Sequence, residues 1–198
     1  MISLEYKAEA LRAKMELFAS LPEHEWKYLV SLLSEKNLAE NEFFVREGDP
    51  VRSVGFVAKG ILKDYYLTED GREFVKEFES EGCFVGPYSG LLTDGKSHFN
   101  TVALEATELL VIPLTSMKSL FERHASWEVF GRRLAEFLFL ERERRERDLL
   151  IKDATERFEA FLLRYGHIAN RIPQKEVAAY LGITPVSLSR LRGKARRP

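Results

Sequence analysis

The chain has 198 residues, enough for one domain of ordinary size and a small second one. Its 45% hydrophobic and 12% aromatic residues exclude a mainly disordered chain. The net charge is −1, no apolar run approaches the ~20 residues that span a bilayer, and the charged N-terminus does not resemble a signal peptide. The single cysteine, Cys83, rules out an internal disulfide framework. We therefore expect a soluble, cytoplasmic protein with no membrane partner.

The first half of the chain changes from a helical to a strand pattern. Ser20-Leu-Pro-Glu23 is typical of a helix start with Ser20 as the cap, and apolar residues follow at helical spacing. From about Leu38 to residues 103–113, short apolar segments alternate with glycine turns. Asp70-Gly71 between two such segments predicts a hairpin. The spacing of these segments predicts an antiparallel sandwich or barrel.

After Pro113 the helical period returns, with a short helix around Met117 and a long one at roughly residues 126–152. Four apolar residues in the long helix are spaced by three and four, as in a coiled-coil seam: Trp127, Phe130, Leu134 and Phe137. This seam is either intramolecular core or a dimer interface, and the length of the helix favours the dimer interface. The alternating charges of residues 141–147 fit a solvated helix face.

Charge is distributed unevenly along the chain. Residues 164–198 carry eight basic residues and one acidic residue, a net charge of +7, whereas the rest of the chain carries −8. A basic segment on an acidic body suggests a module that binds a polyanion, with a solvated basic tail as the alternative. Asp153-Ala-Thr-Glu156 is typical of a helix start. We therefore predict two domains, residues 1–152 and 153–198.

The most informative pattern lies in residues 174–193. Val177, Leu181, Leu188 and Leu191 are apolar positions that would face inward on two short helices. Gly182 lies where a positive φ is commonly needed, and Thr184-Pro185 predicts the start of the second helix. The residues left more outward on that helix are Val186, Ser187, Ser189, Arg190 and Arg192. The pattern is that of a helix-turn-helix, which predicts double-stranded DNA as partner; an ordinary helical hairpin is the alternative.

Several short motifs carry a family resemblance. They are Arg46-Glu-Gly-Asp49, Phe56-Val-Ala-Lys-Gly60, Glu81-Gly-Cys-Phe-Val-Gly86 and the hinge-like residues 150–157. With the order of the elements, they make nearly the whole chain resemble the Crp/Fnr family of bacterial transcription regulators. The resemblance implies an α+β fold: an antiparallel, jelly-roll-like β-roll sensor domain, a long dimerisation helix and a small helix-turn-helix domain. It further implies a homodimer on two DNA half-sites, with RNA polymerase as a candidate partner and a small-molecule effector still to be identified.

Matching positions to the family implies roles for individual residues. Gln174, Lys175, Thr184 and Ser187 would contact phosphates. Arg190 matches a base-reading arginine, for which guanine O6/N7 is the most plausible partner. Val186 is a candidate for contact with a thymine methyl group. Ser189 and Arg192 are further candidates for contact with DNA.

The chain departs from the family pattern in its sensor domain. Gly86-Pro87 stands where cyclic-nucleotide-binding members have Gly-Glu, and residues 97–100 lack the arginine that holds the phosphate. A cyclic phosphate would therefore lack its strongest charge-assisted bond. We expect no response to cyclic nucleotides. The effector-pocket candidates are Gly86, Tyr88, Ser89, Ser97 and His98.

A second departure follows the recognition helix, where family members usually have a β-hairpin wing. Only residues 194–198 remain here, so the fold is expected to lack a full wing. Phosphate contacts of the wing are then absent, or replaced by Lys194, Arg196 and Arg197. The rival interpretation of the whole chain is a β-roll ligand-binding or scaffold protein whose basic tail binds another partner.

Cofactor and enzyme chemistry find little support in the sequence. One cysteine cannot hold an iron–sulfur cluster. Lone histidines such as His24, His98 and His124 are more often structural or exposed than haem ligands. Cys83 is expected to be a small buried residue. No nucleophile–base pair, metal-ligand cluster or glycine-rich phosphate loop is recognisable, so we expect no cofactor, no metal and no enzymatic activity.

Overall fold

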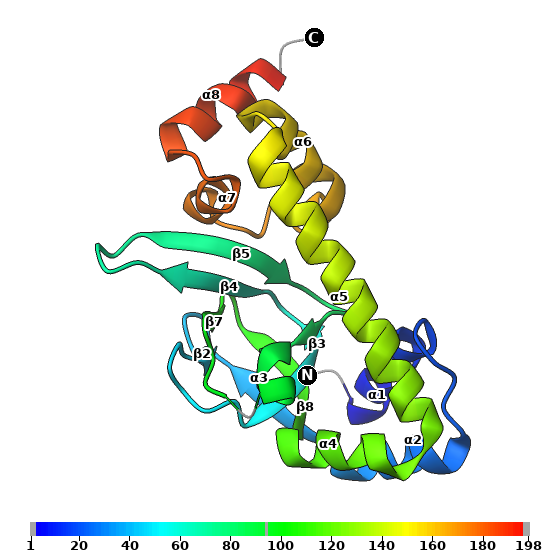
Figure 1. The fold of residues 1–198 in the computed structure, drawn as a ribbon. Coiled ribbons are helices and arrows are strands. Elements are labelled where there is room, and N and C mark those ends of the chain that lie inside the picture. The colour runs from blue at the N-terminus through cyan, green and yellow to red at the C-terminus, as the bar shows by residue number, and fades with distance from the viewer. Residues whose placement is uncertain (1–2, 94, 196–198) are drawn as a thin grey trace.

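The computed structural model describes residues 3–93 and 95–195. Two four-stranded antiparallel sheets form its N-terminal part (Figure 1). One sheet contains, in order, β1 (Ser34–Leu38), β8 (Thr107–Pro113), β3 (Ser53–Lys59) and β6 (Phe84–Val85). The other contains β2 (Phe43–Val45), β7 (Asn100–Ala103), β4 (Leu62–Leu67) and β5 (Glu73–Glu79). Buried residues such as Val57, Leu62 and Leu109 form one core cluster of the two sheets, as expected for a β-roll.

The predicted hairpin is present between β4 and β5. Gly71 adopts a positive φ of 79°, which glycine tolerates without steric cost. The hydroxyl of Thr68 accepts a hydrogen bond from the Arg72 N–H, at 3.1 Å, and closes the turn. The hairpin extends sideways from the roll and passes beneath α7 (Figure 1).

Helices cover one side of the roll. They are α1 (Leu4–Glu16), α2 (Glu23–Leu32), α4 (Leu114–Arg123) and the first half of α5 (Ala125–Ile151), and they share one core cluster with β3 and β8. A short helix, α3 (Tyr88–Thr93), connects β6 to β7. The sequence pattern did not predict α1, whose buried apolar residues are Ala8, Leu11 and Met15. The helix start predicted at Ser20 is displaced, since Pro22 occupies the cap position of α2.

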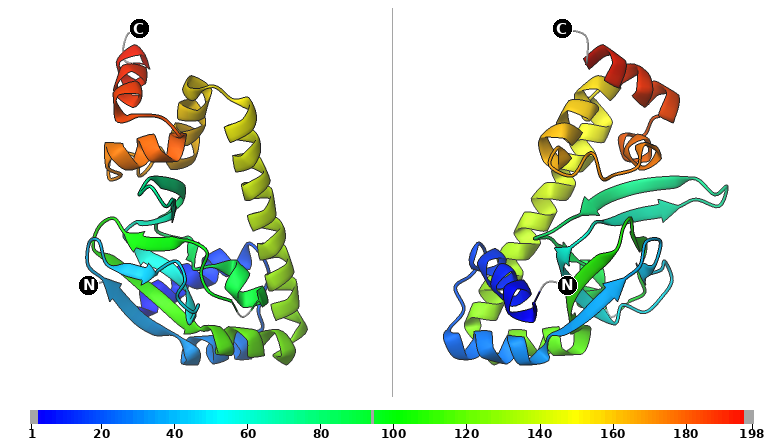
Figure 2. Two further views of the ribbon diagram at one scale, coloured as in Figure 1. Left: turned by 60° about the vertical axis from the view of Figure 1, so that its left-hand side comes forward. Right: turned by 180° about the vertical axis from the view of Figure 1, so that it is seen from behind.

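Three helices follow α5: α6 (Ala154–Tyr165), α7 (Gln174–Leu181) and α8 (Pro185–Ala195). The capping box predicted at the start of α6 is present, with Asp153 and Glu156 each accepting from the other's backbone N–H. Of the three helices, α6 and α7 pack on the β4–β5 hairpin (Figures 1 and 2), where Tyr65, Val75 and Phe78 join their core. Among the described residues, no helix is long and apolar enough to cross a membrane.

Candidate DNA-binding face and sensor cavity

The α7–α8 pair has helix-turn-helix geometry. Gly182 ends α7 with a φ of 66°, and the Ile183 N–H donates to the Ala178 carbonyl at 3.0 Å. The Thr184 hydroxyl accepts from the Ser187 N–H at 3.2 Å and so caps α8. Leu188 of α8 is 1% exposed and belongs to the same core as α7. This contact fixes the two helices against each other.

The predicted DNA contacts lie on the outer surface of this pair. The exposed ones are Gln174, Lys175, Thr184, Val186, Ser189 and Arg190, and the half-buried ones are Ser187 and Arg192. Val186 and Arg190 are four residues apart on α8 and therefore share a face. The Lys175 side chain is 78% exposed, in the first turn of α7. The structure brings these residues together, and their contact with DNA remains a prediction.

Two residues proposed for the wing substitute, Arg196 and Arg197, lie outside the described part of the chain. Lys194 falls in the last turn of α8. The prediction that these residues replace a wing is therefore not tested.

A buried ion pair holds the first helix of the motif against the sheet. Lys63 Nζ on β4 lies 2.8 Å from Glu176 Oε2 on α7, and both residues are 4% exposed. Lys63 also pairs with Glu73 Oε2 at 2.5 Å. The candidate DNA-binding helices thus contact the roll directly through a charged pair that the sequence pattern did not reveal.

A second set of ion pairs joins the segment before α7 to the roll. Arg171 donates to both Glu81 oxygens, at 2.7 and 3.0 Å, and also bonds Glu105. The Gly60 N–H donates to Glu81 Oε1 at 2.8 Å. Burial would raise the pKa of Glu81, but these hydrogen bonds outweigh it and lower that pKa. The connection between α6 and α7 is therefore anchored as well as α7 itself.

Aromatic packing completes this contact. The rings of Phe78 and Tyr165, and those of Tyr165 and Tyr180, are 5.4 Å apart and nearly perpendicular. The Phe78 N–H donates to Tyr165 Oη at 3.4 Å. The Arg145 guanidinium of α5 lies 3.7 Å from the centroid of the Tyr180 ring. These contacts link β5, α5, α6 and α7 in one cluster.

Three of the four residues predicted to form a dimer seam instead lie inside the protomer. Trp127, Phe130 and Leu134 are 0%, 1% and 7% exposed and pack with α1, α2 and α4. Trp127 Nε1 donates to Glu25 Oε2 at 2.8 Å. Because α1 and α2 supply partners for this face, the intramolecular alternative holds, and the seam assignment is wrong for these three residues. Phe137 is 45% exposed and remains a candidate.

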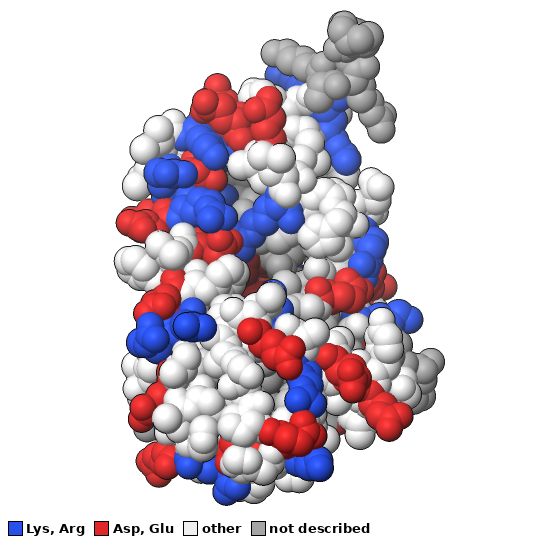
Figure 3. Space-filling model, turned by 90° about the vertical axis from the view of Figure 1, so that its right-hand side faces the viewer, with Lys and Arg blue, Asp and Glu red and all other residues white. Residues whose placement is uncertain are grey.

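The opposite face of α5 is free in the protomer and partly apolar. Phe139, Leu140, Leu150 and Ile151 are 56–77% exposed. Phe139 and Leu150 are eleven residues apart, about three turns at 3.6 residues per turn, so they lie nearly in line. Arg132 and Glu136 form an ion pair four residues apart near the other end. Figure 3, which looks at the side along which α5 runs, shows basic, acidic and uncharged surface intermixed.

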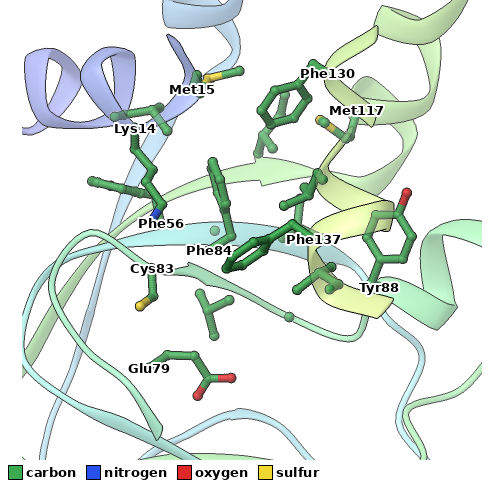
Figure 4. A pocket seen from close by; sticks show the side chains of 18 of the residues that line it. Lys14, Met15, Phe56, Glu79, Cys83, Phe84, Tyr88, Met117, Phe130 and Phe137 are labelled. Atoms are coloured by element: carbon green, nitrogen blue, oxygen red, sulfur yellow. The ribbon is translucent and has the colours of Figure 1, made fainter. Parts of the chain in front are cut away.

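A cavity of about 200 Å³ lies between the roll and α5 (Figure 4). Of the predicted effector residues, Gly86 and Tyr88 line it, and Tyr88 Oη donates to the Gly131 carbonyl of α5 at 3.3 Å. Ser89, Ser97 and His98 are not part of its wall. Ser97 is buried and its hydroxyl donates to the Phe99 carbonyl at 2.6 Å, whereas His98 is exposed. Cys83, which we expected to be buried, is only half-buried in the wall, just before β6.

One end of this cavity is charged. Asp64, Glu77 and Glu79 bring carboxylate oxygens within 4.8 Å of one another, the kind of group that could hold a metal ion. Lys76 pairs with Asp64, at 3.1 Å, and with Glu77. Its ammonium therefore already supplies a cation to two of the three acids. The sequence pattern did not predict this cluster of three carboxylates. A charged residue on the strand face that points into the core could have indicated it: Asp64 lies two residues after Leu62 and therefore on the same face.

A β-roll followed by a long helix and a helix-turn-helix defines a sensor domain joined to a DNA-binding domain, and known proteins match it. The family described as "Cyclic nucleotide-binding domain" matches residues 35–124. "Transcriptional activator protein anr" from Pseudomonas aeruginosa is 30% identical over 168 residues, covering 78% of this chain and 67% of that protein. "Electron transport regulator A" from Shewanella oneidensis is 25% identical over 177 residues, covering 82% and 69%.

Solved structures share the fold. FixK2 from Bradyrhizobium japonicum superimposes with a TM-score of 0.73 at 22% identity, covering 82% of this chain and 83% of that one. The c-di-GMP-responsive regulator CLP from Xanthomonas campestris gives 0.66 at 20% identity, covering 88% and 92%. The chain belongs to the Crp/Fnr family of transcription regulators. It is thus a DNA-binding regulator and not an enzyme.

Proposed function

We propose that this regulator binds DNA as a homodimer, through residues 153–198, and that residues 1–152 sense a small molecule other than a cyclic nucleotide. The observation that carries the proposal is the set of exposed side chains on the helix-turn-helix. Val186 and Arg190 are exposed on one face of α8, and Lys175 is exposed on α7. An arginine at the outer face of the second helix is suited to a guanine edge, and the lysine to a phosphate.

A second copy is the partner that best fits the outer face of α5. That face combines exposed apolar residues, Phe139 and Leu150 among them, with charges of both signs. Such a surface is complementary to itself across a two-fold axis, as dimeric coiled coils are. Pairing along α5 would place two recognition helices about one DNA turn apart, ~34 Å.

The charges of the cavity argue against a cyclic nucleotide. Asp64, Glu77 and Glu79 meet there, and Lys76 is engaged by two of them. Neither Gly86 nor Tyr88 supplies a cation for a phosphate. An anionic phosphate beside these three acids would therefore meet like charges, although Lys14, Arg142 and Arg164 also line the cavity.

Cellular context extends the proposal. The regulator would act in the cytoplasm, where the DNA of a bacterium lies. Activation of transcription would add a contact with RNA polymerase, which stays a prediction. Repression would need only occupancy of the operator.

Selection of bound fragments from genomic DNA tests the DNA-binding role. We expect recovery of a palindrome with half-site centres about one turn apart, and affinity that falls steeply with salt. Equal affinity for all duplexes, or for none, would contradict the proposal. Titration calorimetry with millimolar cyclic AMP and cyclic GMP should show only heats of dilution, and a micromolar dissociation constant for either would overturn the prediction for the sensor domain.

A further inference from the structure

The cavity beside α5 has an apolar part and a charged end. Its apolar walls come from the roll and from α1, α2, α4 and α5, and they include the side chains of Phe56, Phe84, Met117, Phe130 and Phe137. Figure 4 shows Phe84 and Phe137 close to each other, with Cys83 and Glu79 on the side away from Phe130 and Met117. An apolar cavity of ~150 Å³ binds benzene. A cavity of about 200 Å³ therefore accommodates one aromatic ring with a short side chain.

Glu79 is the unusual group in this wall. It is 7% exposed, and its Oε2 has no hydrogen-bond partner among the described residues. Buried carboxyl oxygens normally have partners, and leaving one unsatisfied is unfavourable. Burial raises the pKa of Glu79 well above its usual range, and the neighbouring Asp64 and Glu77 raise it further. The site lacks one hydrogen-bond donor, and a positively charged donor would relieve the repulsion as well.

The cations already present do not fill this role. Lys76 pairs with Asp64 and Glu77. Arg164 of α6 pairs with Glu141 at 2.7 Å and lies 3.9 Å from Glu77. Both are thus paired with acids other than Glu79, and Lys14 and Arg142, which also line the cavity, do not bond Glu79 Oε2. A metal ion would compete with the Lys76 ammonium for two of its three carboxylates.

Resting on the sensor role proposed above, we propose that this cavity binds a small aromatic or similarly apolar molecule that carries a protonated amine, with the amine donating to Glu79 Oε2. The apolar body would lie against Phe84 and Phe130. Because Phe130 belongs to α5, the bound molecule would contact the roll and the long helix together. Its amine end would lie beside Glu77, which faces Arg164 of α6.

Three probes with the same ring and different head groups test the inference: 2-phenylethylamine, 2-phenylethanol and 3-phenylpropionate. Titration calorimetry on the full chain at neutral pH should rank the amine about tenfold or more tighter than the alcohol, because a hydrogen bond between charged groups is the stronger one. The carboxylate should bind weakest, because it meets the buried acids. A carboxylate that binds as tightly as the amine, or no binding by any probe, would overturn the inference.

A variant locates the amine. Glu79→Gln keeps the shape and removes the carboxyl group that would ionise against the amine, so the amine should lose its advantage of about tenfold while the alcohol is unaffected. Glu159→Gln, on the exposed surface of α6, is the matched control and should change neither. Retention of the amine preference by Glu79→Gln would refute the assignment. If that variant does not fold, the ranking of the three probes on the unaltered chain still decides.

The inference and the proposed function fail separately. A chain that selects a palindrome from genomic DNA but binds none of the probes would remain a DNA-binding regulator with a different ligand class. A chain that binds the amine but shows no sequence preference on DNA would keep the cavity assignment and lose the DNA-binding proposal.

Discussion

Loss of one member of the Lys63–Glu176 pair should release the helix-turn-helix from the sheet. In Lys63→Met, the Glu176 carboxylate stays buried, with Lys175 Nζ at 3.6 Å as its remaining ion-pair partner. Removing one partner of a buried pair typically costs ~3–5 kcal/mol, because the other charge is left uncompensated. That cost corresponds to an increase of about a hundredfold or more in the undocked population. Hydrogen exchange should therefore accelerate for amides of α7, while those of β3 and β8 keep their protection.

Two further variants separate the pair from general damage. Lys63→Met combined with Glu176→Leu replaces both charges by apolar groups and should recover most of the lost protection. Arg72→Met breaks the exposed pair with Asp70 on the same hairpin and should change the protection little, because solvent screens that pair. If Lys63→Met changes exchange no more than Arg72→Met does, the buried pair does not hold the domain and this reasoning is refuted.

Three other outcomes are expected. Arg190→Ala should lose ~1–3 kcal/mol of discrimination at one base pair in each half-site. Lys175→Ala should instead weaken binding to all DNA sequences alike and flatten the slope of log affinity against log salt concentration by about one. Titration of both variants with operator and scrambled duplexes measures the two effects. Phe139→Asp should give monomers in sedimentation at micromolar concentration, and Leu17→Asp, also well exposed but just after α1, should not. Glu79→Gln should be more stable than the unaltered chain in chemical denaturation at pH 7. Burial raises the pKa of Glu79 in the folded state, whereas in the unfolded chain this carboxyl group ionises above about pH 4.3. Above that pH, ionisation therefore favours the unfolded chain. The advantage should therefore grow as the pH rises through that value and vanish below it; an advantage that is constant with pH would contradict the burial argument.

The parts of the fold that depend on residues close together in the sequence were predictable from it. The capping box of α6 needs only Asp153 and Glu156, three residues apart, and both hydrogen bonds are present. The turns at Gly71 and Gly182 need a single residue that tolerates positive φ. Thr184 at the start of α8 is a further case, because its hydroxyl meets an N–H three residues later.

The site required contacts between distant residues, and there the pattern was insufficient. Lys63 and Glu176 are 113 residues apart, so neither sequence neighbourhood shows that its charge is buried. Trp127, Phe130 and Leu134 have the spacing of a seam whether the partner is a second copy or the chain itself. The presence of α1 decides between a dimer seam and an intramolecular core. The apolar stripe of α1 is weak, so the sequence pattern did not reveal this helix. Spacing alone therefore identified the buried side of α5 but not what buries it.

The continuity of α5 has a mechanical consequence. The helix runs without a break for 27 residues, with one end packed in the roll core and the other at the capped start of α6. At 1.5 Å per residue it is a rod of about 40 Å, so a tilt of about 5° at its base displaces its far end by about 3.5 Å. A small change in how the base of the rod is seated is thus amplified at its tip, where α6 begins.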